Sequence, residues 1–145
     1  MIEVENLGRV YETGSSRQVV FDGLSFSVGK GETVALLGAS GSGKTTLLNL
    51  ISGIDTPDSG RVLLEGVDVH AQAEPARTLL RRRRIGFVFQ FFNLIPTLTV
   101  GENVALPLEL LGADDQAARE RADDLLEKVG LGGLAERYPE TLSGG

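Results

Sequence analysis

A glycine-rich segment that joins a short apolar run to an apolar helical pattern places the strongest constraint on how this chain can fold. Residues 38–45 read Gly-Ala-Ser-Gly-Ser-Gly-Lys-Thr, which fits the pattern Gly-x-x-x-x-Gly-Lys-Ser/Thr. The run at 33–37 is typical of a strand buried on both faces, and residues 44–52 have the pattern of a helix. A buried strand that turns through glycines directly into a helix predicts an α/β fold.

The same segment predicts a binding site for phosphate groups. Gly41 and Gly43 allow the backbone to wrap with its N–H groups facing phosphate oxygens, and the next helix adds its N-terminal dipole. The Lys44 ammonium would contact the β- and γ-phosphates, and the Thr45 hydroxyl would ligate Mg²⁺. Small-molecule kinases, GTPases, helicases and transporter ATPases all fit this motif. The residues expected to bind the nucleotide here are Gly38, Ser40, Gly41, Ser42, Gly43, Lys44, Thr45 and Thr46.

Composition argues against several other kinds of site. The 145 residues include no cysteine, which excludes disulfides, thiolate zinc sites and cysteine nucleophiles. The single histidine, His70, argues against a histidine-based metal site or a Ser-His-Asp triad. The net charge of −6, with the acidic excess in residues 91–145, argues against a nucleic-acid partner, because phosphate contacts need a basic face. We also expect no membrane span and no secretory signal, since the apolar stretches are short and the first residues lack a basic region.

Alternating hydrophobicity predicts several strands outside the glycine-rich segment. We expect an edge strand at 2–4, a strand at 19–28, and a strand at 61–65 whose Glu65 lies in a solvent-facing hairpin. The apolar run at 85–89 is typical of a second buried strand. Buried strands beside alternating ones indicate an α/β core with an antiparallel accessory sheet.

Helical patterns dominate the rest of the chain. Residues 74–83 read as a helix, and Thr99 and Glu102 have the spacing of a capping box that opens another. Residues 114–129 form a further amphipathic pattern that ends naturally at Gly130. The side chains expected on the buried face of that helix are Ala118, Ala122, Leu125, Leu126 and Val129.

Three further features narrow the class of nucleotide-binding protein. Gln90 ends the expected strand at 85–89, where a polar side chain can face the ligand crevice, although it also suits a loop. Leu-Ser-Gly-Gly at 142–145 lets a phosphate approach the backbone, although Ser-Gly-Gly also suits a linker. Tyr11 precedes the first long strand, where its ring can stack on a purine or pack within a sheet.

In this order the motifs resemble the ATP-binding domain of ABC transporters, and the match runs over essentially the whole chain. The resemblance implies ATP and Mg²⁺ as cofactors, with Tyr11 stacked on adenine. It implies that Gln90 contacts Mg²⁺ or the attacking water. Lys44 and Gln90 would be the catalytic residues, and Thr45 and Gln90 would be the metal ligands.

The end of the chain would begin the family's signature motif. In the family, the serine and glycines of that motif bind a nucleotide held by the opposite subunit, so two chains sandwich two ATP molecules head to tail. The residues assigned to it by the resemblance are Ser143, Gly144 and Gly145. The implied partners are therefore a second ABC ATP-binding subunit and a membrane-spanning transporter subunit, with no nucleic acid.

The segment from Ile85 to Val104 looks most like the branch of the family that releases lipoproteins or exports macrolides. That likeness implies a subunit that powers export or extraction of a lipid-modified or amphipathic substrate. Such a subunit would be cytoplasmic and would lie on the inner face of the cell membrane. The alternatives are a soluble ABC ATPase acting on ribosomes or DNA, against which the lack of an inserted coiled coil speaks, and a module that only binds nucleotide.

The resemblance implies an α/β fold with a P-loop NTPase core, a mainly parallel sheet, an antiparallel accessory sheet and a helical subdomain. Residues 1–145 would form a partial ABC ATP-binding domain, incomplete at the C-terminus. Residues 1–90 would hold the core, β subdomain and Q-loop, and 91–145 the helical subdomain. The family's Walker B aspartate and catalytic glutamate follow the signature motif, so we expect this chain by itself to hydrolyse no ATP. Apolar side chains expected to lie partly open are Val34, Leu36, Phe87 and Phe89.

Two surface segments complete the predictions. We interpret Arg77 and the run Arg81–Arg84 as a solvated helix end, where cations are favoured, rather than as a site for lipid headgroups or nucleic acid. The apolar loop Phe91–Leu98 is expected to dock a membrane partner, although it could instead cover the core of its own domain.

Overall fold

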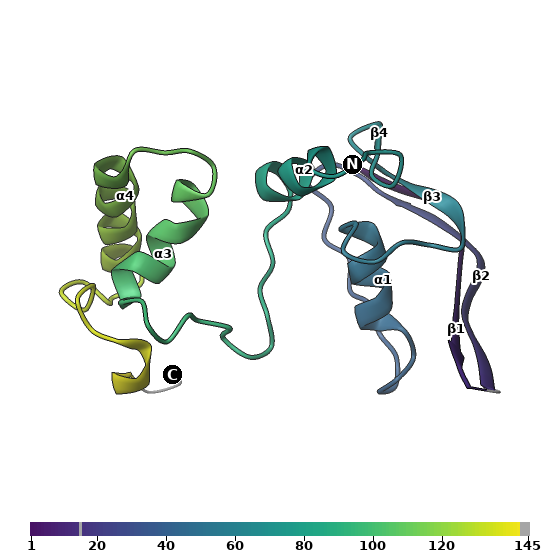
Figure 1. Cartoon of the computed structure of the whole chain (residues 1–145), viewed down its shortest axis with the longest axis horizontal. Coiled ribbons are helices and arrows are strands. Elements are labelled where there is room, and N and C mark those ends of the chain that lie inside the picture. Colours follow the sequence, from purple (N-terminus) through teal and green to yellow (C-terminus); the bar gives the residue numbers. More distant parts are fainter. Residues whose placement is uncertain (15, 143–145) are drawn as a thin grey trace. The chain divides into compact units, whose positions relative to one another are not determined.

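The chain forms two compact units, Met1–Ile85 and Gly86–Gly145. A computed structural model describes residues 1–14 and 16–142 of it. The first unit combines an antiparallel sheet with two helices, and the second is mainly helical (Figure 1). The glycine-rich loop and Tyr11 therefore belong to the first unit, whereas Gln90 belongs to the second.

The first unit is built on a four-stranded sheet with the strand order β2-β1-β3-β4. β1 is hydrogen-bonded on both sides, since Val4 faces Phe26 of one neighbour and Val62 of the other. The expectation of an edge strand at 2–4 is therefore wrong, because alternation along one segment does not reveal how many neighbours it has. The strands are β1 (Ile2–Thr13), β2 (Ser16–Val28), β3 (Ser59–Leu64) and β4 (Val67–Asp68).

The helix that follows the glycine-rich loop packs on this sheet. Leu47 and Leu50 lie on the same side of α1 (Lys44–Ile51), because residues three apart share a helix face, and both are buried. α2 (Ala76–Arg84) leads to Ile85, which packs against the same core. Burial of one face of α1 thereby holds its first turn, and the loop before it, against the sheet. The buried core of the unit consists of Val4, Leu7, Leu47, Leu50, Val62, Leu64 and Val69.

The β3–β4 hairpin confirms the assignment of Glu65. This residue lies in the turn between the two strands, with a left-handed φ of +51°. Its exposed carboxylate pairs with Arg84 Nη1 at 3.0 Å.

The two apolar runs expected to form buried parallel strands belong to no sheet in the described part of the chain. They are residues 33–37 and 85–89. Ile85 nevertheless has strand-like angles, with φ −127° and ψ 125°. A strand requires hydrogen-bonded neighbours, and none of the described strands pairs with either run. Their apolar side chains are exposed as expected, with Val34 56% and Phe89 54% accessible.

The second unit is a pair of helices, α3 (Val100–Glu109) and α4 (Asp115–Lys128), followed by the 3-10 turn η1 (Pro139–Thr141). The predicted capping box is confirmed. Thr99 Oγ1 accepts from the Glu102 N–H at 3.2 Å, and Glu102 Oε2 accepts from the Thr99 N–H at 2.7 Å.

The small core between these helices is made of alanine side chains. Ala118 and Ala122 of α4 are buried with Ala105 of α3, and Leu126 is buried as well. Leu125 is exposed and Val129 is 69% accessible, so the expected face of α4 is wider than the buried one. The physical reason is that α3 covers only the stripe that contains the alanines.

Candidate functional site

The glycine-rich segment forms a loop that packs against β2. Gly41 and Gly43 have φ values of +78° and +91°, the left-handed region that glycine adopts most readily. A Cβ added at Gly43 would lie 2.6 Å from Cγ1 of Val20 on β2. Gly43 therefore serves both the turn into α1 and the close approach of the loop to the sheet.

The N-terminus of α1 has no side-chain cap. Gly43 occupies the N-cap position, and the first turn contains no acidic residue. The first N–H groups of a helix have no partner within the helix, and its dipole is positive at this end. The start of α1 thus presents the backbone donors that bind a phosphate group.

The Lys44 ammonium is held by the loop itself. Its Nζ donates to the carbonyl oxygens of Gly38 and Ala39, at 2.7 Å each, and lies 3.5 Å from Ser42 Oγ. Among residues 1–14 and 16–142 it forms no ion pair with a carboxylate. A positive charge held only by neutral oxygens suits an anionic ligand, because a phosphate oxygen offers a stronger, charge-assisted hydrogen bond.

Thr45 fits the role of one magnesium ligand. Its side chain lies at the exposed start of α1, next to Lys44. The described residues contain no group of three His, Cys, Asp or Glu side chains that could hold a metal. Mg²⁺ commonly binds through one or two protein oxygens together with substrate phosphates and water. The exposed Thr45 hydroxyl can supply one such oxygen. The other loop residues are placed nearby, with Ser40 exposed and Thr46 half-buried.

Tyr11 belongs to a cluster of polar side chains. Its hydroxyl donates to Asp55 Oδ2 at 3.0 Å, and the Arg9 guanidinium lies over its ring, with Cζ 4.7 Å from the centroid. Arg9 also pairs with Asp55 at 2.8 Å and with Asp58 at 3.4 Å. Burial lowers the pKa of Arg9, but Tyr11 and the two carboxylates raise it by more, so its pKa lies above the ordinary value. With 37% of its surface accessible, Tyr11 can still contact a ligand.

Tyr11 lies close to the position on the β1–β2 ribbon that the glycine-rich loop contacts. Tyr11 pairs with Gln18 of β2, two residues from Val20, against which Gly43 lies. A strand rises about 3.3 Å per residue, so these positions are roughly 7 Å apart along the ribbon. In Figure 1 the start of α1 lies at the same end of the first unit as the end of β1 and the start of β2. The distance between the Tyr11 position and the loop is therefore comparable to the length of a nucleotide.

The remaining candidates lie in the second unit or outside the described residues. Gln90 is exposed in the segment between Phe89 and α3, and its contact with Mg²⁺ stays a prediction. Ser143, Gly144 and Gly145 lie outside the described residues.

The apolar loop Phe91–Leu98 is exposed and anchored at one end. Phe91 and Phe92 are 75% and 72% accessible, and neither belongs to the core of the second unit. Asn103 of α3 holds the end of the loop: its Nδ2 donates to the carbonyls of Ile95 and Leu98 at 3.1 Å, and its Oδ1 accepts from the Ile95 N–H at 2.8 Å. The loop therefore presents apolar side chains from a fixed base.

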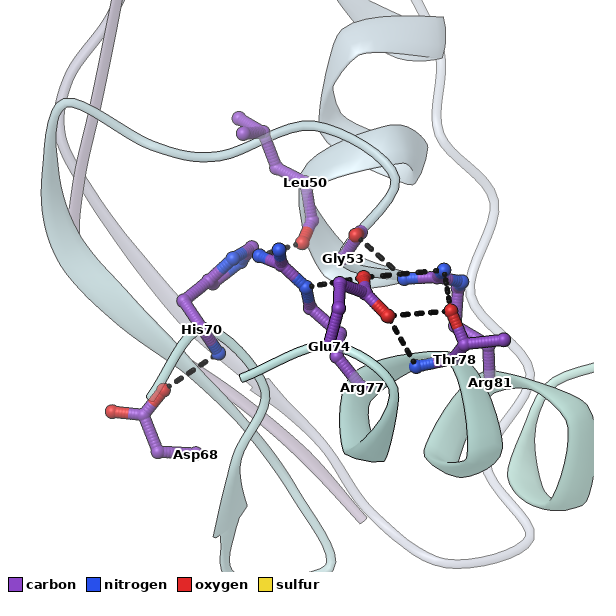
Figure 2. A network of polar contacts seen from close by, with 8 residues as sticks. All are labelled: Leu50, Gly53, Asp68, His70, Glu74, Arg77, Thr78 and Arg81. Carbon is purple, nitrogen blue, oxygen red and sulfur yellow. Dashed lines mark hydrogen bonds and ion pairs between the residues drawn. The ribbon is translucent and has the colours of Figure 1, made fainter. Parts of the chain in front are cut away.

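A polar network links α2 to the end of α1 (Figure 2). Arg81 Nη1 donates to the Gly53 carbonyl at 2.9 Å, and Arg81 Nη2 donates to Thr78 Oγ1 at 2.7 Å. His70 Nε2 lies 2.9 Å from the Leu50 carbonyl oxygen. Burial lowers the pKa of His70, so the neutral ring, with Nε2 donating, is favoured.

This network corrects the interpretation of the arginine run. Arg84 is exposed, as expected for a solvated helix end, but Arg77 and Arg81 are mostly covered. Arg77 Nε donates to Glu74 Oε1 at 3.0 Å, and hydrogen bonds from Thr78 and Arg77 hold the pKa of Glu74 at about 2. Arg81 therefore fastens α2 to the loop after α1, through a Gly53 carbonyl that the sequence of α2 does not reveal. Arg77 instead pairs with Glu74, three residues before it.

Three residues at these sites could not be identified from the sequence. Arg9 and Asp55 are 46 positions apart, and Asn103 is an ordinary polar residue within a helical pattern. The one available signal was the Asp55-Thr-Pro-Asp turn composition, which predicts a turn and says nothing of its partners.

Known proteins share both the sequence and the fold of this chain. Residues 21–145 match a family model described as "ABC transporter". An uncharacterized ABC transporter ATP-binding protein of Mycobacterium tuberculosis is 51% identical over 145 residues, which is 100% of this chain and 58% of that protein. The lipoprotein-releasing system ATP-binding protein LolD of Xanthomonas campestris pv. campestris is 50% identical, over 100% of this chain and 61% of that protein. The chain thus spans about three fifths of the length of these relatives.

A solved structure agrees with the computed one. It is a dimeric ATP-binding cassette in a post-hydrolysis state, bound to ADP and Pi. Its TM-score to this chain is 0.89 at 36% sequence identity, covering 99% of this chain and 64% of the other. The expected fold class, an α/β ABC ATPase cassette with an antiparallel sheet and helices, is thereby confirmed.

Proposed function

The chain belongs to the ABC transporter family, and from this premise we propose that it binds ATP and Mg²⁺ through the loop at 38–45. The observation that carries the proposal is the Lys44 ammonium, which lies at an uncapped helix N-terminus and donates to backbone carbonyls of its own loop. Lys44 would contact the β- and γ-phosphates, and the N–H groups around Gly41 and Gly43 would cradle them. Thr45 would supply one oxygen to Mg²⁺, which neutralises charge on the phosphates when bound.

The other ligands in this proposal come from separate parts of the chain. Tyr11 would stack on adenine, and Gln90 would complete the magnesium shell or orient the attacking water. Ser143, Gly144 and Gly145 would contact a nucleotide held by a second subunit. A dimer is supported by the similar cassette, which was solved as a dimer, and in this proposal its two chains lie head to tail.

Substitution of Lys44 tests nucleotide binding. Lys44→Ala removes a charge-assisted contact of about 1.5–3 kcal/mol, so ATP affinity should fall roughly tenfold to 150-fold. Lys30→Ala is the matched control, because Lys30 is exposed in the turn after β2. The measurement is a titration with fluorescent ATP in the presence of Mg²⁺. Equal affinity of the Lys44→Ala and Lys30→Ala proteins would refute the assignment.

We further propose that the whole protein is the energy-supplying subunit of a transporter that exports or extracts a lipid-modified or amphipathic substrate by ATP hydrolysis. The support is the similarity to LolD, a lipoprotein-releasing system ATP-binding protein. No helix within residues 1–14 and 16–142 is long and apolar enough to cross a membrane. In this proposal the protein is cytoplasmic and reaches the inner face of the membrane through a membrane-spanning partner subunit.

The exposed loop Phe91–Leu98 is the proposed contact with that partner. Its aromatic side chains are accessible, and Asn103 holds its base. A cysteine at Asn93 tests this, since the chain has no other cysteine. The Asn93→Cys protein should cross-link to the membrane subunit in native vesicles. A cysteine at Asp124, exposed on α4, is the control. Cross-links of equal yield from both positions, or none from Asn93→Cys, would contradict the docking surface.

A further inference from the structure

The contacts of Tyr11 form a closed cluster of three side chains. Asp55 uses both of its carboxylate oxygens: Oδ1 accepts from Arg9 Nη2 at 2.8 Å, and Oδ2 accepts from the Tyr11 hydroxyl at 3.0 Å. The Arg9 guanidinium closes the cluster by lying over the tyrosine ring, 4.7 Å from its centroid. Each member therefore contacts the other two.

We propose that Arg9 and Asp55 are positioning residues that fix the Tyr11 ring for stacking on the base of a bound nucleotide. The inference rests on the proposed function, in which Tyr11 meets adenine. A tyrosine on a strand can rotate about two side-chain torsions. Here the hydroxyl is held at the tip of the ring and a cation covers one face. A base can then stack only on the opposite face.

The carboxylate that holds the ring is itself held from two directions. The N–H groups of Ile54 and Asp55 both donate to the Asn49 carbonyl of α1, at 2.9 and 3.2 Å. Asp58, three residues later, accepts from the Val10 N–H of β1 at 2.7 Å. The segment between them therefore spans from the end of α1 to the strand that carries Tyr11.

This arrangement links the two ends of the proposed nucleotide site. α1 begins at the loop that would hold the phosphates, and the Asn49 carbonyl near its end accepts from the Asp55 N–H. A single eight-residue helix thus connects the phosphate loop to the residues that fix the ring on which the base would stack. Binding then requires no ordering of the tyrosine, because the free protein already holds it.

The size of the effect follows from the ordering that the cluster removes. Immobilising a side chain on binding weakens affinity by about twofold to tenfold. Asp55→Asn keeps the shape of the side chain but loses its charge and one of its two acceptor oxygens, so it can no longer accept from both Arg9 and Tyr11. Its ATP affinity should fall by that factor. Its affinity for inorganic tripolyphosphate, which has no base, should not change.

The test compares ATP with tripolyphosphate in four proteins: wild type, Asp55→Asn, Tyr11→Ala and the control Glu5→Gln. Glu5 pairs with Arg61 Nε at 2.7 Å on the same sheet, so its substitution breaks an ion pair outside the cluster. Tyr11→Ala should lose about fivefold or more in ATP affinity, from lost stacking. Asp55→Asn should lose ATP affinity only, and Glu5→Gln should lose neither.

Fluorescence provides a second readout. The chain has no tryptophan and two tyrosines, so Tyr138→Phe leaves Tyr11 as its one tyrosine, whose emission can be excited without that of phenylalanine. In that background Asp55→Asn should lower the fluorescence anisotropy of Tyr11 before nucleotide is added, because the ring is released. A protein that is merely less stable would not show this at a temperature where it remains folded.

The outcomes separate this inference from the proposed function. If Asp55→Asn weakens ATP and tripolyphosphate equally, or weakens neither, while Tyr11→Ala selectively weakens ATP, the positioning role is wrong and adenine stacking stands. If Tyr11→Ala leaves the ratio of the two affinities unchanged, adenine stacking is wrong and the positioning role falls with it. Selective loss of ATP in both variants, with reduced anisotropy in Asp55→Asn, supports both.

Discussion

Gly43→Ala should destabilise the first unit for two reasons that can be measured separately. The first is the backbone: φ is +91°, and an L-residue in a left-handed conformation costs about 1–2 kcal/mol. The second is space, because the added Cβ would lie 2.6 Å from Val20 Cγ1 and 3.1 Å from Phe21 Cζ. Overpacking of this kind costs about 1–3 kcal/mol. The free energy of unfolding should therefore fall by about 2–5 kcal/mol.

Two further substitutions separate these contributions. Gly41→Ala is the matched control, since its φ is +78° and an added Cβ would meet nothing within 4 Å. It should show the backbone cost alone, about 1–2 kcal/mol. Val20→Ala removes the methyl group that the new Cβ would meet. In the double variant, Val20→Ala should relieve most of the steric cost of Gly43→Ala, which would appear as a favourable coupling energy of about 1–2 kcal/mol.

The assay is urea unfolding followed by circular dichroism for wild type, the three single variants and the double variant. The contact between the loop and β2 is the part of the reasoning at risk. It would be refuted if Gly43→Ala cost no more than Gly41→Ala. It would be refuted equally if Val20→Ala and Gly43→Ala were simply additive.

Three other outcomes are expected. Thr99→Ala should lower the free energy of unfolding by about 1 kcal/mol in the same urea assay, because the Glu102 N–H loses its acceptor. Thr99→Ser keeps a hydroxyl acceptor and should retain most of that free energy. Burial lowers the pKa of His70 from 6.5, so below pH 6.5 the unfolded chain binds more protons than the native one. The free energy of unfolding should therefore decrease as the pH is lowered through this range. The contribution of His70 to that decrease is at most about 1.4 kcal/mol per pH unit. His70→Gln should remove this contribution from the pH dependence of the free energy of unfolding, measured by unfolding curves from pH 7 to 5. The 145-residue chain should release no phosphate from ATP with Mg²⁺, and turnover that Lys44→Ala abolishes would reveal a catalytic carboxylate among its residues.

Features that depend on neighbours in the sequence could be predicted from it. The loop at 38–45, the helix that begins at Lys44 and the capping box of Thr99 and Glu102 all match the structure. Each is determined by residues within a few positions of one another, through a backbone dihedral angle, a helical period or a short hydrogen bond. The sequence pattern therefore carried their chemistry as well as their location.

The pairing of strands could not be predicted from local sequence. The alternation at 2–4 marked a strand correctly, but only the sheet showed that β1 has neighbours on both sides. The apolar runs at 33–37 and 85–89 predict buried strands, yet none of the described strands pairs with them. An apolar run records a tendency to be buried, whereas a strand exists only where another strand completes its hydrogen bonds.

Close approaches between distant segments were decided by the tertiary structure alone. Gly101 lies in the first turn of α3 although glycine is a poor helix former, because an added Cβ would lie 3.2 Å from the Ala135 carbonyl oxygen. Asp55 is one of 20 acidic residues, and nothing adjacent to it in the sequence distinguishes it from the others. The fold brings it within 2.8 Å of Arg9, 46 positions away, and within 3.0 Å of the Tyr11 hydroxyl. The local sequence determined the phosphate loop because a loop is made of consecutive residues; the surroundings of Tyr11 are made of residues that meet only after the chain has folded.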